Sequence, residues 1–342
     1  METMTATEKF TDIITAAIKK AQNDKIYFEE LYNNTDAPVG KNEFLFFVKP
    51  EITLPSDSIQ LEKILDLVQD KIEEFGLTVH NIKLLSAKYL QEHNIIAQHY
   101  GVINKIAGNA VANLSEGAKE KFIQFYGKPI SEFKVLGGTE FLAQYPMFNA
   151  LSLDLVWQNI ETKKLAGGTY CEVLKLDNET VHLINGFHGR QLEHFTEHGR
   201  SIVVFTLSGN LSWADARGKF IGATNPSAAH PGSLRRTFLD KKAELGLSEV
   251  SQGVNGVHLS AGPVEALIEL SRYNSNFSDK SKSKTFTDYS FGKQLQANFT
   301  PAQVETILAN GNVDVNGKAT SIFDLTEEKD SDESIAILKK AL

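Results

Sequence analysis

Three segments that lie far apart in the sequence carry side chains suited to one kind of chemistry. They span residues 44–50, 221–236 and 255–262. Together they supply cations, a hydroxyl, an amide and an imidazole, among them Lys49, Arg235, Thr224, Asn255 and His258. Phosphoryl transfer needs such a set, because the migrating group spreads negative charge over its oxygens and the protein must position and neutralise it.

The cations and the histidine have different parts in this chemistry. Arginine binds phosphate oxygens in pairs through its planar fork, whereas lysine acts as a mobile point charge. An ordinary imidazole, with a pKa of about 6.5, is largely unprotonated and nucleophilic near neutral pH. A phosphorylated imidazole remains a reactive donor, so His258 can collect a phosphate and pass it on.

A carboxylate can hold the imidazole in one tautomer by accepting the proton on its other nitrogen. A helix is predicted from about Pro263 to Tyr273, and Glu265 and Glu269 lie four residues apart on one of its faces. Either carboxylate can orient the ring.

The elements that must position these side chains follow from the hydrophobic pattern. Residues 42–49 form a continuous apolar run that ends in a lysine, which is typical of a central strand. An amphipathic helix is predicted over residues 58–75, a strand over 77–85 and a second buried strand over 201–207. This order permits an α+β core.

In chain order, the motifs are Val-Lys-Pro at the first strand end, Gly-Ala-Thr-Asn-Pro, Pro-Gly-x-x-Arg and Asn-x-x-His-x-Ser. This series resembles the nucleoside diphosphate kinase family, weakly over residues 42–100 and strongly over 200–273. The spacing from Thr224 to Arg235 also matches that family. The resemblance implies an α+β fold with a ferredoxin-like βαββαβ core, an inserted subdomain and helical extensions.

The resemblance also implies a reaction and its participants. A nucleoside triphosphate phosphorylates His258, a nucleoside diphosphate takes the phosphate away, and Glu269 orients the ring. Mg²⁺ bridges the β- and γ-phosphates and is held through the nucleotide, not by a metal site of the chain. The residues expected to contact nucleotide phosphate or sugar are Lys49, Thr224, Arg235 and Asn255. Family members form closed symmetric oligomers, so a homo-oligomer is a further expectation.

The sequence departs from the family at several positions. The family's His-Gly-Ser-Asp is replaced by His258-Leu259-Ser260-Ala261. The arginine expected six residues before Thr224 is absent; Arg217, seven before, or Lys219, five before, can replace it, and Arg217 is the predicted nucleotide-binding residue.

The chain is expected to contain one interrupted domain with extensions. Residues 1–41 form an N-terminal helical extension, and 42–273 form the kinase-like domain. Residues 101–199 are an insertion in that domain and replace the segment that carries the family's base-stacking phenylalanine. A polar linker and a helical C-terminal extension occupy residues 274–342.

The amino-acid composition limits the classes of function that the protein can have. The net charge of −8 argues against general nucleic-acid binding, which needs clustered lysine and arginine. The single cysteine, Cys171, excludes an intramolecular disulfide. Without an apolar run long enough for a membrane span or a secretory signal, a cytoplasmic location is expected. His194 and His198 have helical spacing for a zinc site, but they lack a clear third ligand, so a polar surface segment is the prediction.

The leading functional hypothesis is a nucleoside-diphosphate-kinase-like phosphotransferase that binds ATP or another triphosphate. A nucleotide-binding or scaffolding protein with the kinase fold and little turnover is the main alternative, favoured by the changed residues after His258 and the replaced base-binding segment. A histidine phosphorelay to a protein partner is a third hypothesis, since the large insertion would suit a docking surface.

Overall fold

A computed structural model describes residues 10–34 and 36–342. The first nine residues of the predicted N-terminal extension lie outside the described residues. The chain divides into two compact units, which we call unit 1 (Met1–His93 with His198–Leu342) and unit 2 (Asn94–Glu197).

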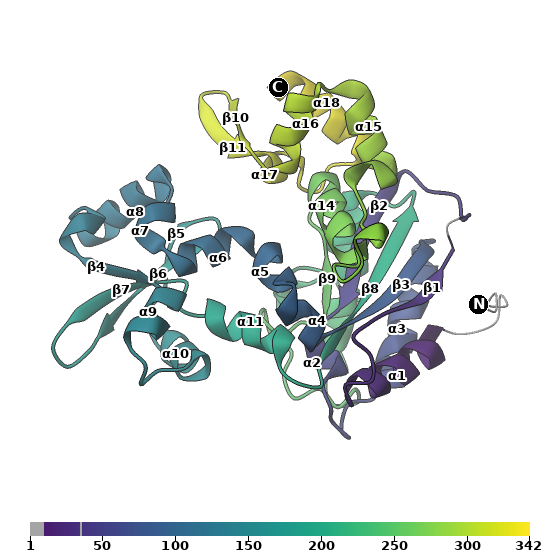
Figure 1. Ribbon diagram of the computed structural model, residues 1–342, viewed down its shortest axis with the longest axis horizontal. Coiled ribbons are helices and arrows are strands. Elements are labelled where there is room, and N and C mark those ends of the chain that lie inside the picture. The colour runs from purple at the N-terminus through teal and green to yellow at the C-terminus, as the bar shows by residue number, and fades with distance from the viewer. Residues whose placement is uncertain (1–9, 35) are drawn as a thin grey trace. The chain divides into compact units, whose positions relative to one another are not determined.

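Unit 1 contains a five-stranded sheet with the order β1-β3-β8-β2-β9, in which every neighbouring pair is antiparallel (Figure 1). Its strands are β1 Phe28–Asn33, β2 Asn42–Val48, β3 Thr78–Ser86, β8 Ser201–Gly209 and β9 Val257–Leu259. Helix α3 (Leu61–Glu74) connects β2 to β3, and α13 (Leu234–Asp240) lies between β8 and β9. The resulting βαββαβ succession, with β2 and β8 in the centre, confirms the predicted ferredoxin-like α+β core.

The central strand β2 is buried on both faces, which explains its continuous apolar sequence. Phe44, Phe46 and Val48 alternate along the strand and belong to the core under the helices. Phe47 therefore points to the opposite face, and its partner in the register is His258.

One face of that sheet packs on amphipathic helices. In α3, Ile64, Leu65, Val68 and Ile72 recur at helical spacing and are buried. Burying one such side chain contributes about 1.5–3 kcal/mol. α3 ends just before Gly76, whose φ of +61° is easily reached only by glycine. The helices of unit 1 before the extension are α1 Phe10–Ala21, α2 Pro50–Thr53, α3, α4 Ala87–Glu92, α12 Trp213–Asp215, α13 and α14 Pro263–Asn274.

The C-terminal extension is folded and docks on the core. It comprises α15 Ser290–Asn298, α16 Pro301–Leu308, β10 Asn312–Val315, β11 Lys318–Ser321, α17 Ile322–Thr326 and α18 Ser331–Ala341. The Asp330 carboxylate accepts hydrogen bonds from Lys41 Nζ at 2.8 Å, from Asn42 Nδ2 at 3.0 Å and from the Trp213 N–H at 2.9 Å. This carboxylate ties the start of α18 to the start of β2.

Unit 2 has its own four-stranded sheet, in the order β4-β7-β6-β5. Its strands are β4 Lys134–Gly137, β5 Lys163–Ala166, β6 Thr169–Lys175 and β7 Thr180–Ile184. Its helices are α5 Ile95–His99, α6 Gly101–Gly108, α7 Ala110–Asn113, α8 Glu116–Tyr126, α9 Gly138–Gln144, α10 Ala150–Trp157 and α11 His188–Thr196. Two apolar clusters fill the unit, and Cys171 is a buried free thiol in one of them.

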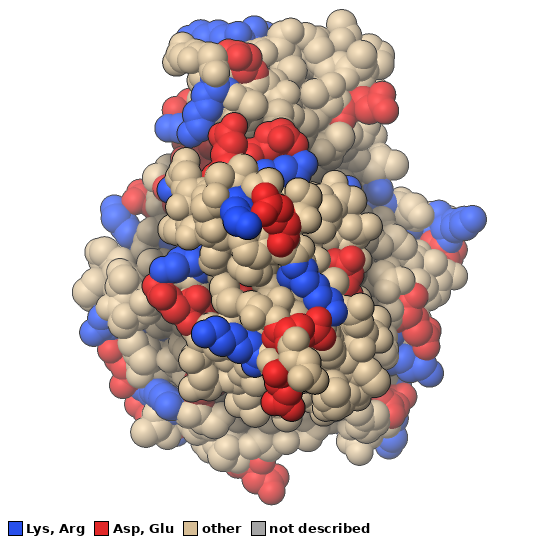
Figure 2. Space-filling model, turned by 90° about the vertical axis from the view of Figure 1, so that its left-hand side faces the viewer, with Lys and Arg blue, Asp and Glu red and all other residues tan. Residues whose placement is uncertain are grey.

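Charged side chains of both signs share the surface. On the face that Figure 2 shows, lysines and arginines lie among aspartates and glutamates. Within the described residues, no helix is both long and apolar enough to cross a membrane.

We predict that Asp330→Asn lowers the free energy of unfolding by about 1–3 kcal/mol at pH 7, because the new amide group faces Lys41. Burial alone would raise the pKa of Asp330, but the hydrogen bonds from Lys41, Trp213 and Asn42 lower it. A lowered pKa stabilises the fold above the unfolded value, near 3.9, and this contribution is lost as the pH falls through the folded pKa. Denaturant titrations from pH 7 to 3 should show the difference shrinking below about pH 4; the control, Asp332→Asn, should stay within about 0.5 kcal/mol.

Candidate functional site

His258 lies in the middle of the short edge strand β9. Val257 and Leu259 point into the apolar core, so strand alternation turns His258 to the other face. There its ring stacks on Phe47, with centroids 4.4 Å apart and planes at 21°. The His258 side chain keeps 16% of its surface exposed.

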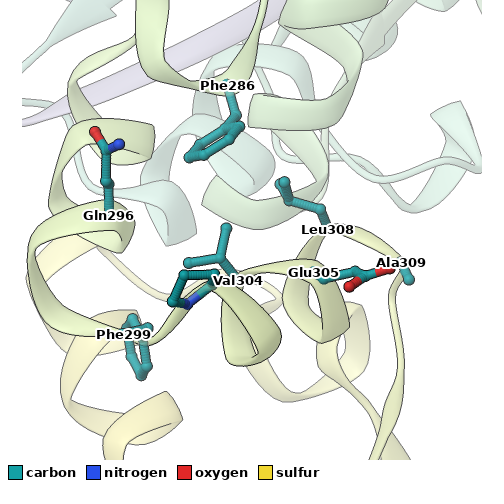
Figure 3. Close-up of a pocket in the computed structure, with 8 residues that line it drawn as sticks. Phe286, Gln296, Phe299, Val304, Glu305, Leu308 and Ala309 are labelled. Carbon is teal, nitrogen blue, oxygen red and sulfur yellow. The ribbon is translucent and has the colours of Figure 1, made fainter.

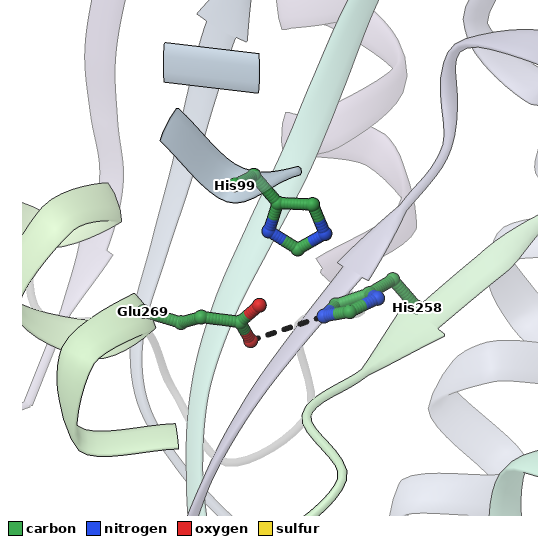
Figure 4. Close-up of side chains that lie close together, drawn as sticks. All are labelled: His99, His258 and Glu269. Atoms are coloured by element: carbon green, nitrogen blue, oxygen red, sulfur yellow. Dashed lines mark hydrogen bonds and ion pairs between the residues drawn. The ribbon is translucent and has the colours of Figure 1, made fainter. Parts of the chain in front are cut away.

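The Glu269 carboxylate on α14 points at the His258 ring (Figure 4). Glu269 Oε2 lies 3.0 Å from His258 Nε2, and the Glu269 side chain is only 3% exposed. Ser260 Oγ donates to the same carboxylate oxygen. A carboxylate facing Nε2 favours the tautomer with the proton on Nε2, which places the lone pair on Nδ1.

Glu265, the other candidate for orienting the ring, has a different partner. Its Oε2 accepts the Ala261 N–H at 2.7 Å and so holds the loop between β9 and α14. Burial and the nearby Glu269 raise the pKa of Glu265.

Lys49 and Asn255 join the three sequence segments. Lys49 Nζ donates to Asn255 Oδ1 at 2.8 Å, and Asn255 Nδ2 donates to the carbonyl oxygens of Thr224 at 3.1 Å and Gln252 at 3.0 Å. Asn255 is 1% exposed, whereas Thr224 is exposed. Burial lowers the pKa of Lys49 to about 8; the nearby Glu51 opposes this shift and Arg235 adds to it.

Arg235 is 4% exposed and donates to backbone oxygens on both sides of the site. Its Nη1 bonds the Gly222 carbonyl at 2.9 Å, and its Nη2 bonds the Val257 carbonyl at 3.1 Å. The guanidinium therefore fixes the turn at Gly222, where φ is +86°, against the strand that carries His258.

Of the two candidates for the missing arginine, Arg217 reaches the histidine strand. Arg217 Nη1 donates to the Leu259 carbonyl at 3.1 Å, whereas Lys219 pairs with Asp215 at 2.8 Å and is 55% exposed. Residues Ala216–Ile221 form a π-helix. Because a π-helical turn holds more residues than an α-helical turn, it can take up the one-residue offset of Arg217 from the expected position.

Three further residues belong to the site but were not predicted as site residues. Ser260 follows His258 by two residues, so strand alternation could have placed it on the same face. Glu51 accepts the Gly256 N–H at 2.8 Å, and Phe47 supports the ring. Nothing in the local pattern distinguishes these two from an ordinary helix start and an ordinary core residue.

The cavity found in unit 1 lies elsewhere, in the C-terminal extension (Figure 3). It has a volume of about 560 Å³ and contains none of the predicted site residues. Its lining is mostly apolar and comprises Phe286, Gln296, Phe299, Pro301, Val304, Glu305, Leu308 and Ala309.

We predict that Ser260→Ala destabilises unit 1 by about 1.5–3 kcal/mol, because it removes a buried hydrogen bond to a carboxylate. The chain has two tryptophans, so Trp157→Phe leaves the buried Trp213 as a fluorescence reporter of unit 1 in urea titrations. The matched control is Ser271→Ala, which removes only a bond to the Leu267 carbonyl in the same helix. A Ser260→Ala midpoint equal to that of the control would contradict the buried bond.

Comparison with known proteins agrees with the motifs. No protein-family model matches the sequence. A nucleoside diphosphate kinase from Pelobacter propionicus is 33% identical over 112 residues, which is 33% of this chain and 66% of the relative. The chain thus spans slightly less than two thirds of that relative's length.

Solved structures that are similar include nucleoside diphosphate kinases from two organisms. The structure from Encephalitozoon cuniculi is 15% identical, with coverage of 72% of this chain and 96% of that chain and a TM-score of 0.32. The structure from Pyrobaculum aerophilum is 19% identical, with coverage of 70% and 98% and a TM-score of 0.32. TM-scores this low do not establish a shared fold, so the fold assignment depends on the strand order. Over those 112 residues the chain is therefore similar in sequence to a nucleoside diphosphate kinase, although it differs from it at most positions.

Proposed function

We propose that the chain transfers a phosphoryl group from a nucleoside triphosphate to a nucleoside diphosphate through a phosphohistidine at His258. The observation that carries this proposal is the buried Glu269 carboxylate, 3.0 Å from Nε2 of a ring that is itself partly exposed. A histidine held in this way has its nucleophilic nitrogen fixed in place and in one tautomer.

In the first step, the Nδ1 lone pair of His258 attacks the γ-phosphorus of the triphosphate. A P–N bond forms, the bond from that phosphorus to the β–γ bridging oxygen breaks, and the nucleoside diphosphate leaves with the electron pair. The ring becomes positively charged in this step, so the Glu269 carboxylate stabilises it while the proton stays at Nε2. Ser260 keeps the carboxylate in position through its hydrogen bond.

In the second step, a terminal phosphate oxygen of a nucleoside diphosphate attacks the phosphorus. The P–N bond breaks, the electron pair returns to Nδ1, and a new triphosphate leaves. Lys49, Arg235 and Arg217 would bind the phosphates, and Thr224 and Asn255 would contact phosphate or sugar, since cations and donors lower the energy of the spread negative charge.

The residues around His258 fit a metal that arrives with the nucleotide. The carboxylates there are engaged, Glu269 by His258 and Ser260, and Glu51 by the Gly256 N–H. The neighbouring cations suit phosphate oxygens and repel a bare divalent ion. Mg²⁺ would be held through the nucleotide, where it neutralises charge on the β- and γ-phosphates.

One observation favours the alternative of a nucleotide-binding or scaffolding protein with little turnover. Both Nη atoms of Arg235 donate to backbone carbonyls, and Lys49 is only 9% exposed. Phosphate binding through these two side chains would require them to exchange internal hydrogen bonds for bonds to the ligand.

We predict that Mg²⁺ and γ-labelled ATP label the chain with a phosphate that is labile in acid and stable in base. His258→Gln should abolish the label, and an added nucleoside diphosphate should discharge it from the unaltered chain. The matched control is His230→Gln, an exposed histidine in the loop after Thr224, which should label normally.

The outcomes of that labelling experiment separate the hypotheses. Label that survives His258→Gln would refute His258 as the nucleophile. Label that no diphosphate discharges would favour a phosphorelay to a protein partner, and no label despite ATP binding would favour the scaffold.

We further predict that the affinity for the triphosphate falls as the pH rises through about 8, the pKa to which burial lowers Lys49. Deprotonation removes the charge that attracts the phosphates, so above this pH the affinity should fall by up to about tenfold per pH unit. Titrations of ATP with Mg²⁺ from pH 6.5 to 9.5 would measure it. Lys49→Gln should abolish this fall in affinity near pH 8, and Lys219→Gln should retain it. A fall that persists in Lys49→Gln would contradict the assignment to Lys49.

A further inference from the structure

The C-terminal extension reaches the loop that follows His258. The Glu328 N–H donates to the Ala261 carbonyl at 2.9 Å. Gly262 lies directly against the extension, because a Cβ there would be 2.4 Å from the Thr326 carbonyl oxygen. The turn at Thr326–Glu328 is therefore packed on the connection between the strand of His258 and the helix of Glu269.

The same turn brings two carboxylates to Arg217. Arg217 Nη2 lies 4.0 Å from Glu327 Oε1, and Arg217 Nε lies 4.0 Å from Glu328 Oε1. Both glutamates are about half exposed, with 48% and 51% of their side-chain surface accessible, whereas Arg217 is 19% exposed. Because Arg217 also donates to the Leu259 carbonyl, its guanidinium lies between the histidine strand and the extension.

The turn is held firmly in this place. Asp330 and Ser331 lie two and three residues after it and bind Asn42 at the start of β2. Glu328 has a φ of +57°, a left-handed conformation that costs energy for a residue other than glycine. Such a conformation persists only where the surrounding contacts impose it, so the backbone of the turn is held beside Arg217.

We propose that the C-terminal extension positions Arg217 through Glu327 and Glu328, and thereby weakens the binding of nucleotide phosphates at the His258 site. This inference rests on the proposed function. The two carboxylates compete with phosphate oxygens for the same guanidinium, and their negative charge repels the polyphosphate. The extension thus lowers the affinity of the site for nucleotides.

The test compares the affinity for ATP with Mg²⁺ in the full chain and in the double variant Glu327→Gln, Glu328→Gln. The amides keep the size of the side chains and leave the backbone bond to Ala261 in place. We expect the dissociation constant to fall about threefold to tenfold at low ionic strength, given two partly exposed pairs. The difference should shrink above about 0.1 M salt, where screening is strong.

The matched control is Asp332→Asn with Glu333→Gln. It changes the net charge by the same amount on the same extension, but these carboxylates pair with Lys41 and Lys329 instead. Its dissociation constant should stay within about twofold of the unaltered chain, as expected for exposed pairs. Equal affinities in the double variant and the control, or weaker binding in the double variant, would overturn the proposal.

A third background tests whether the carboxylates act through Arg217. In an Arg217→Gln background, the two glutamine substitutions should raise the affinity for ATP much less than they do in the unaltered chain. The guanidinium that Glu327 and Glu328 contact is absent from this background. A gain of the same size in this background would overturn the assigned role of Arg217. If the unaltered chain does not bind ATP at all, the proposed function itself fails, and melting temperatures confirm that every variant is folded.

Discussion

One buried carboxylate determines how the candidate site is assembled. Glu269 is 3% exposed, and a carboxylate removed from water is stable only if hydrogen-bond donors replace the lost water. Ser260 Oγ and the His258 ring supply that contact; His258 lies on the face of β9 opposite the apolar core, and Ser260 directly follows the strand. The helix must therefore begin directly after the strand, and the hydrogen bond from the Ala261 N–H to Glu265 fixes this short connection.

The buried cations Lys49 and Arg235 also need hydrogen-bond partners in place of water, but theirs are not charged. The hydrogen-bond acceptors seen for Lys49 and Arg235 are neutral: the Asn255 amide and the backbone carbonyls of Gly222 and Val257. Neutral acceptors satisfy the donors without neutralising the charges, and the carboxylate near Lys49 is that of Glu51. The lowered pKa of Lys49 is the other consequence of this arrangement, because burial disfavours its charged form.

The parts of the core that have a strong local signal could be predicted from the sequence, whereas β1, α13 and β9 could not. The apolar run of β2, the periodic α3 and the motif around His258 all appear where the pattern placed them. The contacts of Arg235 could not be predicted, because a charged side chain that binds backbone carbonyls leaves no trace in the hydrophobic pattern. The π-helix at Ala216–Ile221 was also beyond reach, since a single wide turn has no periodicity of its own.

Ala261, where the sequence differs from the resembling family, is also in contact with the C-terminal extension. Where the resembling family has an aspartate, Ala261 has no side-chain oxygen, and its backbone N–H and carbonyl are bound by Glu265 and Glu328 instead. The next residue, Gly262, is in close contact with the backbone of the extension. Acidic groups near this loop therefore come from the following helix and from the extension, so any change in the extension acts directly beside the histidine strand.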